Sequence, residues 1–244
     1  MKFFGIIGKP IKHSASKLWF ENYFIKNKID AKFYMLTPSE NELKNLKEYL
    51  RSNKFSGLLV TLPYKKAVLP NCDSLDDAAK EIGAVNIIAI KNEKLCGYNI
   101  DYSAFESEIL KLKPAQDYRF AIILGNGGAA AAVEYALKKN NIKYIKVSRK
   151  SESDCILYEN LSDADLQKAD LIINATPLGM GNLINDFPPI NYNSISPNTV
   201  AFDLIYNPDE TLFLTKCKQK NCIAINGLGM VNAVYETASK IFEL

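Results

Sequence analysis

The stretch "RFAIILGNGGAAAAVEYALKK" (residues 119–139) joins an apolar run to an alanine-rich segment through a turn that holds Gly125, Gly127 and Gly128. The apolar run is typical of a buried β-strand, and the alanine-rich segment is typical of a helix. Glycines at such a turn let the backbone approach a pyrophosphate, and the free N–H groups at the helix start face its negative charge. Ala130, at the place of a third glycine, still permits close helix-to-strand packing. This order favours a dinucleotide site over a tight turn with no ligand.

Apolar runs of this kind alternate with helical patterns along nearly the whole chain. Nine runs have the composition of buried parallel strands, at residues 3–8, 32–37, 57–62, 85–90, 120–125, 144–148, 171–176, 199–205 and 222–226. Between the second and third runs, Ser39 and Glu42 have the spacing of a capping box, and Leu43, Leu46 and Leu50 share one helical face. The sequence therefore predicts an α/β fold.

Size and charge narrow the class of protein. A chain of 244 residues with 48% hydrophobic and 23% charged residues indicates a globular protein with one large domain or two small ones, and we expect two. The formal net charge is only +3, and the lysines are interleaved with Asp and Glu. We therefore expect no nucleic-acid partner.

The start of the chain, its apolar runs and its cysteines indicate in which compartment the protein lies. The start "MKFFGIIGKP" has an apolar run too short for a secretory signal, and no later stretch reaches the roughly 20 apolar residues of a membrane span. The five cysteines include no CxxC pair, which favours reduced thiols and a cytoplasmic protein. Because His13 is the only histidine, we expect no metal site, and any other proton donor must be Lys, Asp, Glu, Tyr or Cys.

The segment "KLKPAQDY" (residues 111–118) is a polar connector with a proline between a helical pattern and a new strand. It predicts a domain boundary nearby, with the preceding helix from about Asp101 as a hinge. The last helical segment, residues 229–244, could pack on either half, and its pattern does not decide which.

The strand after the glycine turn indicates which dinucleotide is bound. "YIKVSRK" (residues 144–150) ends where NAD-binding proteins carry Asp or Glu to hold the ribose 2′-hydroxyl, but this chain has Ser148, Arg149 and Lys150 there. A guanidinium and an ammonium attract a 2′-phosphate, so the sequence predicts NADP(H). The alternative is that Arg149 and Lys150 are solvated charges at a strand end. Because arginine is scarce in this chain, that interpretation is the weaker one.

Another strand ends in "INATPLGM" (residues 173–180), which turns sharply through Pro177 and Gly179. In an open sheet, cofactors lie at the carboxyl ends of strands, so this loop is a candidate neighbour of the nicotinamide ribose. A purely structural turn explains the spacing almost as well.

The first half of the chain holds further polar groups at strand ends. Ser14 and Ser16, in "GKPIKHSASK" (residues 8–17), can donate to a small carboxylate or cap a helix, and the residues alone leave both open. "VTLPYKK" (residues 60–66) raises the question of whether Lys65 or Lys66 faces a buried site. "GAVN" and "GYNID" place Asn86 and Asp101 where polar side chains can converge on a cleft.

Taken together, these motifs resemble the shikimate dehydrogenase family from end to end. Nine motifs occur in the family's order: "GKPIKHSAS", "VTLPYK", "GAVN", "GYNID", "GNGGAA", "SRK", "INATPLGM", "FDLIYNP" and "NGLGM". The resemblance implies reversible, NADP-dependent reduction of 3-dehydroshikimate to shikimate, a step in aromatic amino acid biosynthesis. The small-molecule substrate would be the main partner, and the protein would be a monomer or a homodimer.

The resemblance also implies a role for individual residues. Ser14 and Ser16 would bind the substrate carboxylate, with Tyr206 beside it. Lys65 and Asp101 would be catalytic: the Lys65 ammonium would stabilise the oxyanion, Asp101 would orient it, and which of the two transfers the proton is open. Other implied ligand-binding residues are Thr61 and Asn86 for the substrate, and Gly125, Asn126, Gly127, Gly128, Ala129, Ser148, Arg149, Lys150, Thr176 and Gly227 for the cofactor. Lys66 is expected to be solvated.

The implied architecture has two α/β domains with a cleft between them. Residues 1–101 and 228–244 would form a substrate-binding domain with a mostly parallel sheet, to which the final helix returns. Residues 102–227 would form a Rossmann-type NADP-binding domain.

Several residues depart from the family pattern. Leu59 stands where asparagine is usual and Val234 where glutamine is usual, so two hydrogen bonds to substrate hydroxyls, each worth about 1 kcal/mol, appear lost. Lys17, Phe20 and Ile100 replace proline, histidine and threonine. The alternatives are a dehydrogenase for quinate or another hydroxy-carboxylate, and a nucleotide-binding relative without catalysis.

Overall fold

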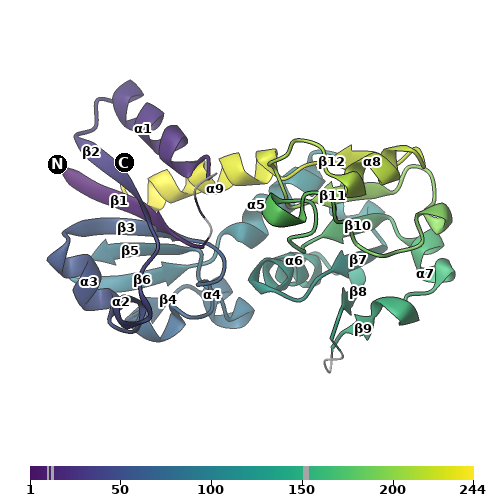
Figure 1. Ribbon diagram of the computed structural model, residues 1–244, viewed down its shortest axis with the longest axis horizontal. Helices are drawn as coiled ribbons and strands as arrows, with labels where there is room; N and C mark the ends of the chain where they lie inside the picture. The colour runs from purple at the N-terminus through teal and green to yellow at the C-terminus, as the bar shows by residue number, and fades with distance from the viewer. Residues whose placement is uncertain (10, 12–13, 151–153) are drawn as a thin grey trace. The chain divides into compact units, whose positions relative to one another are not determined.

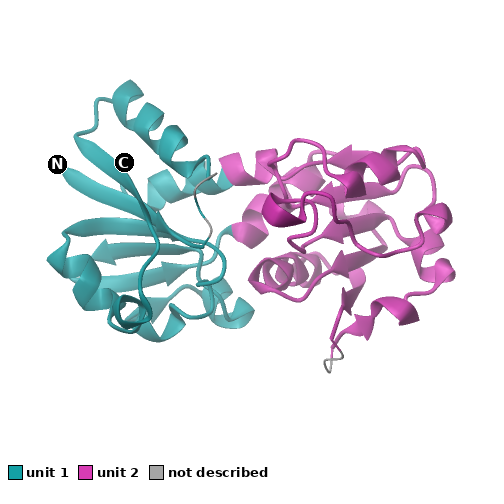
Figure 2. Cartoon of the chain, in the orientation of Figure 1, with its two compact units in different colours: residues 1–100, 233–244 teal, residues 101–232 magenta. Residues whose placement is uncertain are grey.

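The chain forms two compact α/β units, each built on its own six-stranded sheet (Figure 2). The structure is a computed structural model that describes residues 1–9, 11, 14–150 and 154–244. Unit 1 contains Met1–Ile100 and Ala233–Leu244, and unit 2 contains Asp101–Asn232. The α/β prediction is confirmed, and the connector at residues 111–118 lies inside unit 2.

The sheet of unit 1 has the strand order β2-β1-β3-β5-β6-β4 (Figure 1). Its strands are β1 (Lys2–Ile7), β2 (Ala31–Leu36), β3 (Phe55–Val60), β4 (Ser74–Leu75), β5 (Ile87–Lys91) and β6 (Lys94–Tyr98). The strands β2, β1 and β3 are parallel, and β4 is parallel to β6. All four runs predicted in this half form strands, whereas β4 and β6 were not predicted.

One predicted strand runs in the opposite direction from the one expected. The run at 85–90 was expected to be a parallel strand, but β5 pairs antiparallel with both β3 and β6. For the pairing with β6 the reason is the two-residue turn between β5 and β6, where Asn92 and Glu93 have φ of +49° and +61°. Such a short turn with two left-handed residues can join only antiparallel strands.

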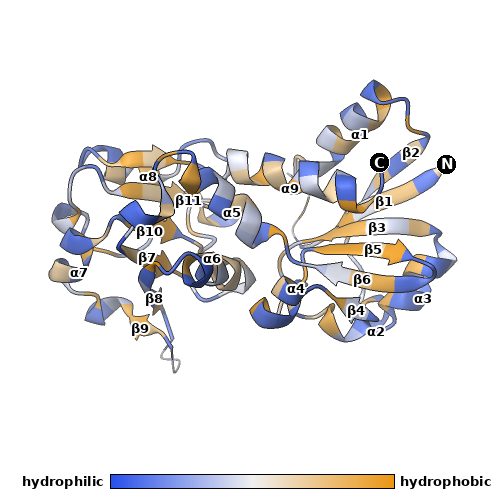
Figure 3. Ribbon diagram, turned by 180° about the vertical axis from the view of Figure 1, so that it is seen from behind, coloured by the Kyte–Doolittle hydropathy of each residue, from blue (hydrophilic) through white to orange (hydrophobic). Residues whose placement is uncertain are grey.

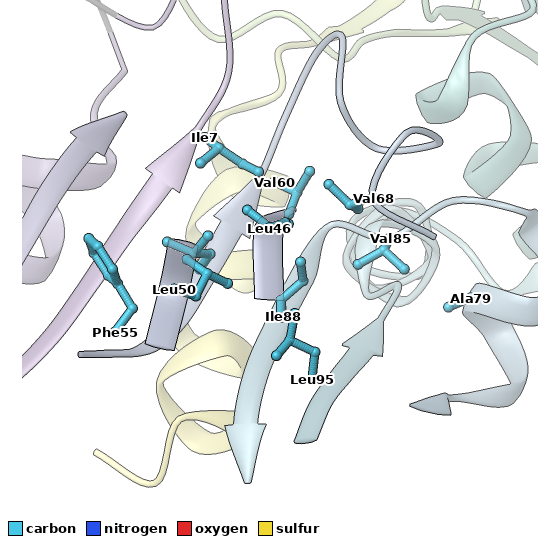
Figure 4. Close-up of a cluster of buried hydrophobic side chains, with 11 residues drawn as sticks. Ile7, Leu46, Leu50, Phe55, Val60, Val68, Ala79, Val85, Ile88 and Leu95 are labelled. Carbon is cyan, nitrogen blue, oxygen red and sulfur yellow. The ribbon is translucent and has the colours of Figure 1, made fainter. Parts of the chain in front are cut away.

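The helices α2 (Glu40–Lys44), α3 (Leu46–Ser52) and α4 (Asp77–Ile82) contribute to the core of unit 1. The predicted capping box is confirmed, because Ser39 caps α2 and the Glu42 carboxylate accepts the Ser39 N–H at 2.7 Å. Figure 4 shows the hydrophobic cluster to which these helices and the sheet contribute; its members are Ile7, Leu46, Leu50, Phe55, Leu58, Val60, Val68, Ala79, Val85, Ile88 and Leu95.

Aromatic residues from α1 (Ser16–Lys26) and from the end of α9 (Leu228–Ile241) form a second core in unit 1. Phe242 is only 6% exposed, and its ring centroid lies 5.0 Å from that of Phe4 and 6.2 Å from that of Phe20. A Cβ atom at Gly57 would overlap the Phe242 ring, so the strand needs a glycine at this point. The second half of the last helix is thus part of the first unit.

The sheet of unit 2 has the order β12-β11-β10-β7-β8-β9, and all its strand pairs are parallel (Figure 1). The strands are β7 (Phe120–Leu124), β8 (Lys143–Ser148), β9 (Ile156–Leu157), β10 (Leu171–Asn174), β11 (Val200–Asp203) and β12 (Ile223–Ile225). The chain progresses outward from β7 to β9 and then from β10 to β12 on the other side. This is the Rossmann strand order, and its reversal point lies between β7 and β10.

Helices cover both faces of this second sheet. The helices α7 (Asp163–Lys168) and α8 (Leu212–Lys218) contribute Leu166 and Phe213 to a core with the strands. The helices α5 (Asp101–Leu110) and α6 (Gly128–Lys139) pack together. The ring of Phe105 on α5 packs against that of Phe202 on β11, with ring centroids 5.2 Å apart. Figure 3 shows the hydrophobic strands between more polar helix surfaces. Among the described helices, none is long and apolar enough to cross a membrane.

We expect Phe242→Ala to lower the free energy of unfolding by about 3–5 kcal/mol, because it removes a buried ring from the aromatic core. Chemical denaturation measures this change. Gly57→Ala should also destabilise the wild type, but less so in the Phe242→Ala background, where the overlapping ring is absent. Ile25→Ala, at a side chain that is 77% exposed, is the control and should change stability by no more than about 0.5 kcal/mol. Additive effects of the Gly57 and Phe242 changes would contradict the packing described here.

Candidate functional site

The predicted glycine turn joins β7 to α6 at the reversal point of the second sheet. Gly125 has φ of +115°, and a Cβ atom there would lie 2.9 Å from the carbonyl oxygen of Ala175. Gly127 is the cap residue of α6, and no atom lies within 4 Å of the place where its Cβ would be. The first glycine is therefore required by the neighbouring backbone, whereas the second leaves open space in front of the helix.

The start of α6 suits an anionic group. Its cap residue provides no side chain to accept hydrogen bonds from the first-turn N–H groups of Gly128 and Ala129. These N–H groups have no intrahelical acceptors, and the helix dipole places partial positive charge at this end. Ala130 is fully buried, as close packing of the helix on the sheet requires. The described backbone thus fits a pyrophosphate, and Asn126 lies in the same turn.

A buried lysine that the sequence reading missed supports this turn. The Lys146 ammonium, on β8, donates to the Glu134 carboxylate at 2.7 Å, to Asp154, and to Asn126 Oδ1 at 3.4 Å. Burial alone would lower the pKa of Lys146, but its hydrogen bonds to Asp154 and Glu134 raise the pKa overall, so the lysine stays charged. Lys146 therefore links the glycine turn to the segment after β8.

The residues predicted to select the cofactor lie directly after β8. Ser148 is half-buried, and its Oγ accepts the Lys150 N–H at 3.2 Å. Arg149 and Lys150 are both exposed. The chain thus presents two cations and no carboxylate at positions 148–150, an arrangement that can bind a phosphate.

A buried polar network connects the ends of β10 and β11. Asn174 and Asp203 are neighbours in the strand register, and Asn174 Nδ2 donates to Asp203 Oδ1 at 3.1 Å. The Thr176 hydroxyl donates to Asn174 Oδ1 at 2.6 Å. The network thereby fixes the loop that carries Thr176, one of the predicted cofactor contacts.

The same network fixes the loop after β11. The Asp203 carboxylate accepts the Ile205 N–H at 3.0 Å and the Thr211 hydroxyl at 2.6 Å. Tyr206, predicted to lie beside the substrate carboxylate, follows directly and is half-buried. Burial raises the pKa of Asp203 to about 6, although its hydrogen bonds oppose that shift. Asn174 and Asp203 lie in the motifs "INATPLGM" and "FDLIYNP", but only the register of adjacent strands shows that they meet.

Gly227 has a structural reason to be glycine. A Cβ atom there would overlap the Leu204 carbonyl oxygen, and the Gly227 N–H donates to Ile205 O at 2.9 Å. Close approach of two backbones therefore explains this glycine, and its contact with a cofactor stays a prediction.

The predicted substrate residues of unit 1 lie on loops that follow β1 and β3. The Lys9 N–H donates to the Leu62 carbonyl at 2.9 Å, and the Thr61 N–H donates to Ile7 O at 2.9 Å. A Cβ atom at Gly8 would overlap Thr61. The two loops are therefore held together at the carboxyl ends of adjacent parallel strands.

Lys65 and Asn86 are brought close to each other by backbone hydrogen bonds. The Lys65 carbonyl accepts the Val85 N–H at 2.8 Å, and Asn86 Oδ1 accepts the Ile100 N–H at 2.9 Å. Lys65 is half-buried and Asn86 is buried, whereas Lys66 is exposed, as expected.

Asp101 is buried and is the first residue of α5, directly after Ile100. It belongs to unit 2, whereas Lys65 belongs to unit 1. The pairing of the Lys65 ammonium with the Asp101 carboxylate stays a prediction.

The two predicted serines form a row of hydroxyl groups with a tyrosine that was not predicted. Ser16 Oγ lies 2.7 Å from Ser14 Oγ and 2.9 Å from the hydroxyl of Tyr235 on α9. The capping alternative holds in part: the cap residue of α1 is Ala15, without a side-chain hydrogen bond, but Ser14 Oγ accepts the N–H of Ser16, the first residue of α1, at 3.3 Å. His13 lies outside the described residues.

The departures from the family pattern are filled by apolar packing. Leu59 is buried within β3 between Ile6 and Ile87. Phe20 is fully buried in the aromatic core. Val234, on α9, is half-buried directly before Tyr235. Apolar side chains therefore occupy three positions at which the family usually has polar ones.

A separate hollow of about 1120 Å³ lies at the opposite, amino-terminal end of the second sheet. Its lining includes Arg119, Lys143 and Asp170, which stand at or just before the starts of β7, β8 and β10. Arg119 forms an ion pair with Asp170 at 3.5 Å. None of the predicted site residues lines it, so we do not count it as part of the site.

Asp203 should make the stability of the protein depend on pH. Its pKa is about 6 in the folded protein against 3.8 ordinarily, so its proton stabilises the fold below pH 4, and this contribution is lost as the pH rises through 6. The shift corresponds to about 3 kcal/mol. The free energy of unfolding of the wild type minus that of Asp203→Asn should therefore fall between pH 4 and 7. Denaturation at a series of pH values measures it, and a constant difference would contradict the assignment.

The sequence is similar to known proteins over its whole length. A family model described as the shikimate dehydrogenase substrate binding domain matches residues 6–88. A curated relative named NADP(+) shikimate dehydrogenase, from Methanococcus aeolicus, is 36% identical and is aligned over 100% of this chain and 91% of its own length.

Solved structures share the fold. A shikimate 5-dehydrogenase from Thermus thermophilus in complex with NADP(H) and shikimate matches with a TM-score of 0.88 and 26% identity, over 99% of this chain and 93% of its own. The ligand-free 5-ketofructose reductase of a Gluconobacter species matches with a TM-score of 0.81 and 27% identity, over 99% and 92%. The identity and coverage of the curated relative, together with the motifs and strand order described above, show that the chain belongs to the shikimate dehydrogenase family.

Proposed function

We propose that the protein reversibly reduces 3-dehydroshikimate to shikimate with NADP(H). The observation that carries this proposal is the arrangement in unit 1, where hydrogen bonds tie the loops of Ser14, Thr61 and Lys65 together beside Asn86. A hydroxy-carboxylate needs such a set: neutral donors for its carboxylate, polar groups for its hydroxyls, and an ammonium for its reacting oxygen. The relatives of the same family carry the name of this reaction.

The two parts of the chain divide the work in this proposal. Residues 1–101 and 228–244 bind the substrate, and residues 102–227 bind the cofactor. The match of residues 6–88 to a substrate binding domain supports the first assignment. The Rossmann strand order and the glycine turn support the second.

Lys65 handles the proton in this mechanism. NADP(H), when bound, supplies or accepts the hydride at the substrate carbon. The Lys65 ammonium donates a hydrogen bond to the reacting oxygen, stabilises the negative charge that develops there, and holds the proton that the oxygen takes up. Asp101 orients the ammonium through its carboxylate. In the oxidation direction, the same pair takes the hydroxyl proton.

Other residues of unit 1 hold the substrate in place, with Tyr206 contributed by unit 2. Ser14 and Ser16 donate to the carboxylate, and Tyr206 closes this side of the ring. Thr61 and Asn86 bind ring hydroxyls. These contacts position the carbon for hydride transfer and leave the chemistry to Lys65 and the cofactor.

The cofactor contacts follow the order of the second sheet. Backbone N–H groups of the turn at residues 125–129 hold the pyrophosphate. Ser148, Arg149 and Lys150 hold the 2′-phosphate of the adenosine ribose. Thr176 lies by the nicotinamide ribose, where the Asn174 hydrogen bond fixes its loop. The unrestricted space at Gly127 supports this placement.

A related substrate is the second candidate. Leu59 and Val234 stand where the family usually has hydrogen-bonding side chains, so fewer groups select the ring hydroxyls and a related hydroxy-carboxylate is discriminated against less strongly. Quinate and other hydroxy-carboxylates are the compounds to compare. The shared fold of a 5-ketofructose reductase supports a breadth of substrates on this scaffold.

The experiment that tests the proposal is a steady-state assay at 340 nm with shikimate and quinate, each with NADP and NAD. Fastest turnover with shikimate and NADP is the expected result, and Lys65→Ala should lower kcat by at least about 100-fold because proton transfer is lost. Lys66→Ala, at the exposed neighbouring lysine, is the matched control and should leave kcat unchanged.

Faster turnover of quinate would favour the second candidate. No turnover with any pair would favour a binding protein without catalysis, and an active Lys65→Ala would refute the role of that lysine.

Arg149→Ala should raise the KM for NADPH by roughly 10-fold or more while leaving the KM for NADH nearly unchanged, because only NADPH carries the 2′-phosphate. Initial rates at varied cofactor concentration measure both constants. Arg119→Ala, at an exposed arginine of the same unit, provides the control. Equal effects on both cofactors would show that Arg149 does not read the 2′-phosphate.

A further inference from the structure

The hydroxyls of Ser14, Ser16 and Tyr235 form a row joined by two oxygen-to-oxygen contacts, at 2.7 Å and 2.9 Å. The two distances do not fix which oxygen donates. A phenol is a stronger hydrogen-bond donor than an aliphatic alcohol, which favours donation from Tyr235 to Ser16 and from Ser16 to Ser14. Donation along such a row polarises each successive hydroxyl.

Ser14 is the end of this row. Its oxygen accepts the Ser16 N–H at 3.3 Å and lies 2.7 Å from the Ser16 hydroxyl oxygen. A hydroxyl has two lone pairs and one hydrogen, so donation from Ser16 would leave the Ser14 hydrogen for a ligand. Ser14 is half-buried, whereas Ser16 is only 1% exposed. The polarised end of the row is thus the end that a ligand can reach.

The tyrosine hydroxyl is held rigidly in its place. The Tyr235 ring lies 5.3 Å from the Trp19 ring and 5.8 Å from the Phe20 ring, and Tyr235 itself is buried. Phe20 and Val234, two of the departures from the family pattern, are therefore next to Tyr235 in space or in sequence. One altered side chain, Phe20, thus packs directly against the ring that carries this hydroxyl.

We propose that Tyr235 is a positioning residue of the carboxylate subsite, which donates to Ser16 and thereby directs the hydroxyl hydrogens of the serines toward an anion. The inference rests on the proposed function, because it assigns the carboxylate of the same substrate to this site. It makes the site selective for an ionised carboxylate, since a neutral ester gains less from polarised donors. Tyr235 acts through Ser16 and stabilises substrate binding, so its effect falls on KM and not on kcat.

The single tryptophan of the chain offers a direct probe of this subsite. Trp19 contacts the Tyr235 ring, so its fluorescence can follow the binding of shikimate without any turnover. Tyr235→Phe removes the hydroxyl and keeps the ring. We expect it to weaken shikimate binding roughly tenfold and to raise the KM by a similar factor, with kcat and the KM for NADP unchanged.

Tyr23→Phe is the matched control, because the Tyr23 ring stacks on the same Trp19 with ring centroids 5.1 Å apart. The Tyr23→Phe variant should bind shikimate like the wild type. Shikimate methyl ester separates a structural role from a polarising one: the affinity ratio of wild type to Tyr235→Phe should be near one for the ester. In the Ser16→Ala background, Tyr235→Phe should have no further effect on shikimate affinity. Thermal unfolding of each variant checks that it is folded.

The possible outcomes separate this inference from the proposed function. Equal affinity of wild type and Tyr235→Phe for shikimate, or equal loss for the acid and the ester, would overturn the role of Tyr235. Binding that depends on Tyr235 as expected, but without oxidation of shikimate, would support the inference and overturn the proposed function. A wild type that neither responds to shikimate in fluorescence nor oxidises it with NADP would overturn both.

Discussion

Close approach of two chain segments at the carboxyl ends of neighbouring parallel strands is the constraint on which this structure depends. In unit 1 the turn at Gly8, after β1, passes so near Thr61, after β3, that a side chain at position 8 would overlap it. In unit 2 Gly125, after β7, passes equally near the backbone of Ala175, after β10. Parallel strands bring their ends to one edge, and glycine lets the loops meet there. Both loop pairs carry candidate site residues.

Buried polar groups keep these loops in one conformation. Asn174 and Asp203 hold the loops after β10 and β11, and Lys146 holds the glycine turn through Asn126. Each of these groups is desolvated, and the raised pKa of Asp203 shows that its burial opposes ionisation. A network of this kind contributes precise geometry more than stability, because the hydrogen bonds only offset the loss of hydration. Thr176 and Asn126, two of the predicted cofactor contacts, are themselves hydrogen-bonded to these groups.

The departures from the family pattern change the character of unit 1 without removing its polar edge. Leu59 and Phe20 extend the apolar packing of the sheet, while Ser14, Ser16 and Asn86 remain hydrogen-bonded. Tyr235 adds a hydroxyl to the serine pair from a distant part of the chain. In the function that we propose, the altered residues bear on which acid is bound, whereas Lys65 and Asp101, to which we assign the reaction, are the family's usual residues.

The sequence by itself determined the features that depend on residues close together in the chain. All nine predicted strands, the capping box of Ser39 and the glycine turn are present, because local periodicity and backbone preferences specify them. Because whole strands are buried, they appear in the sequence as continuous apolar runs, and these runs predict the α/β class. The position of Arg149 after a strand was likewise evident from spacing.

Only the tertiary structure decided how distant segments meet. The antiparallel direction of β5 followed from a turn whose left-handed residues carry no strong sequence signal, and the pairing of Asn174 with Asp203 followed from the register of two strands. The contact of Ser16 with Tyr235 joins residues 219 positions apart. Such contacts are set by packing of the complete core, and no local pattern contains the information that brings their partners together.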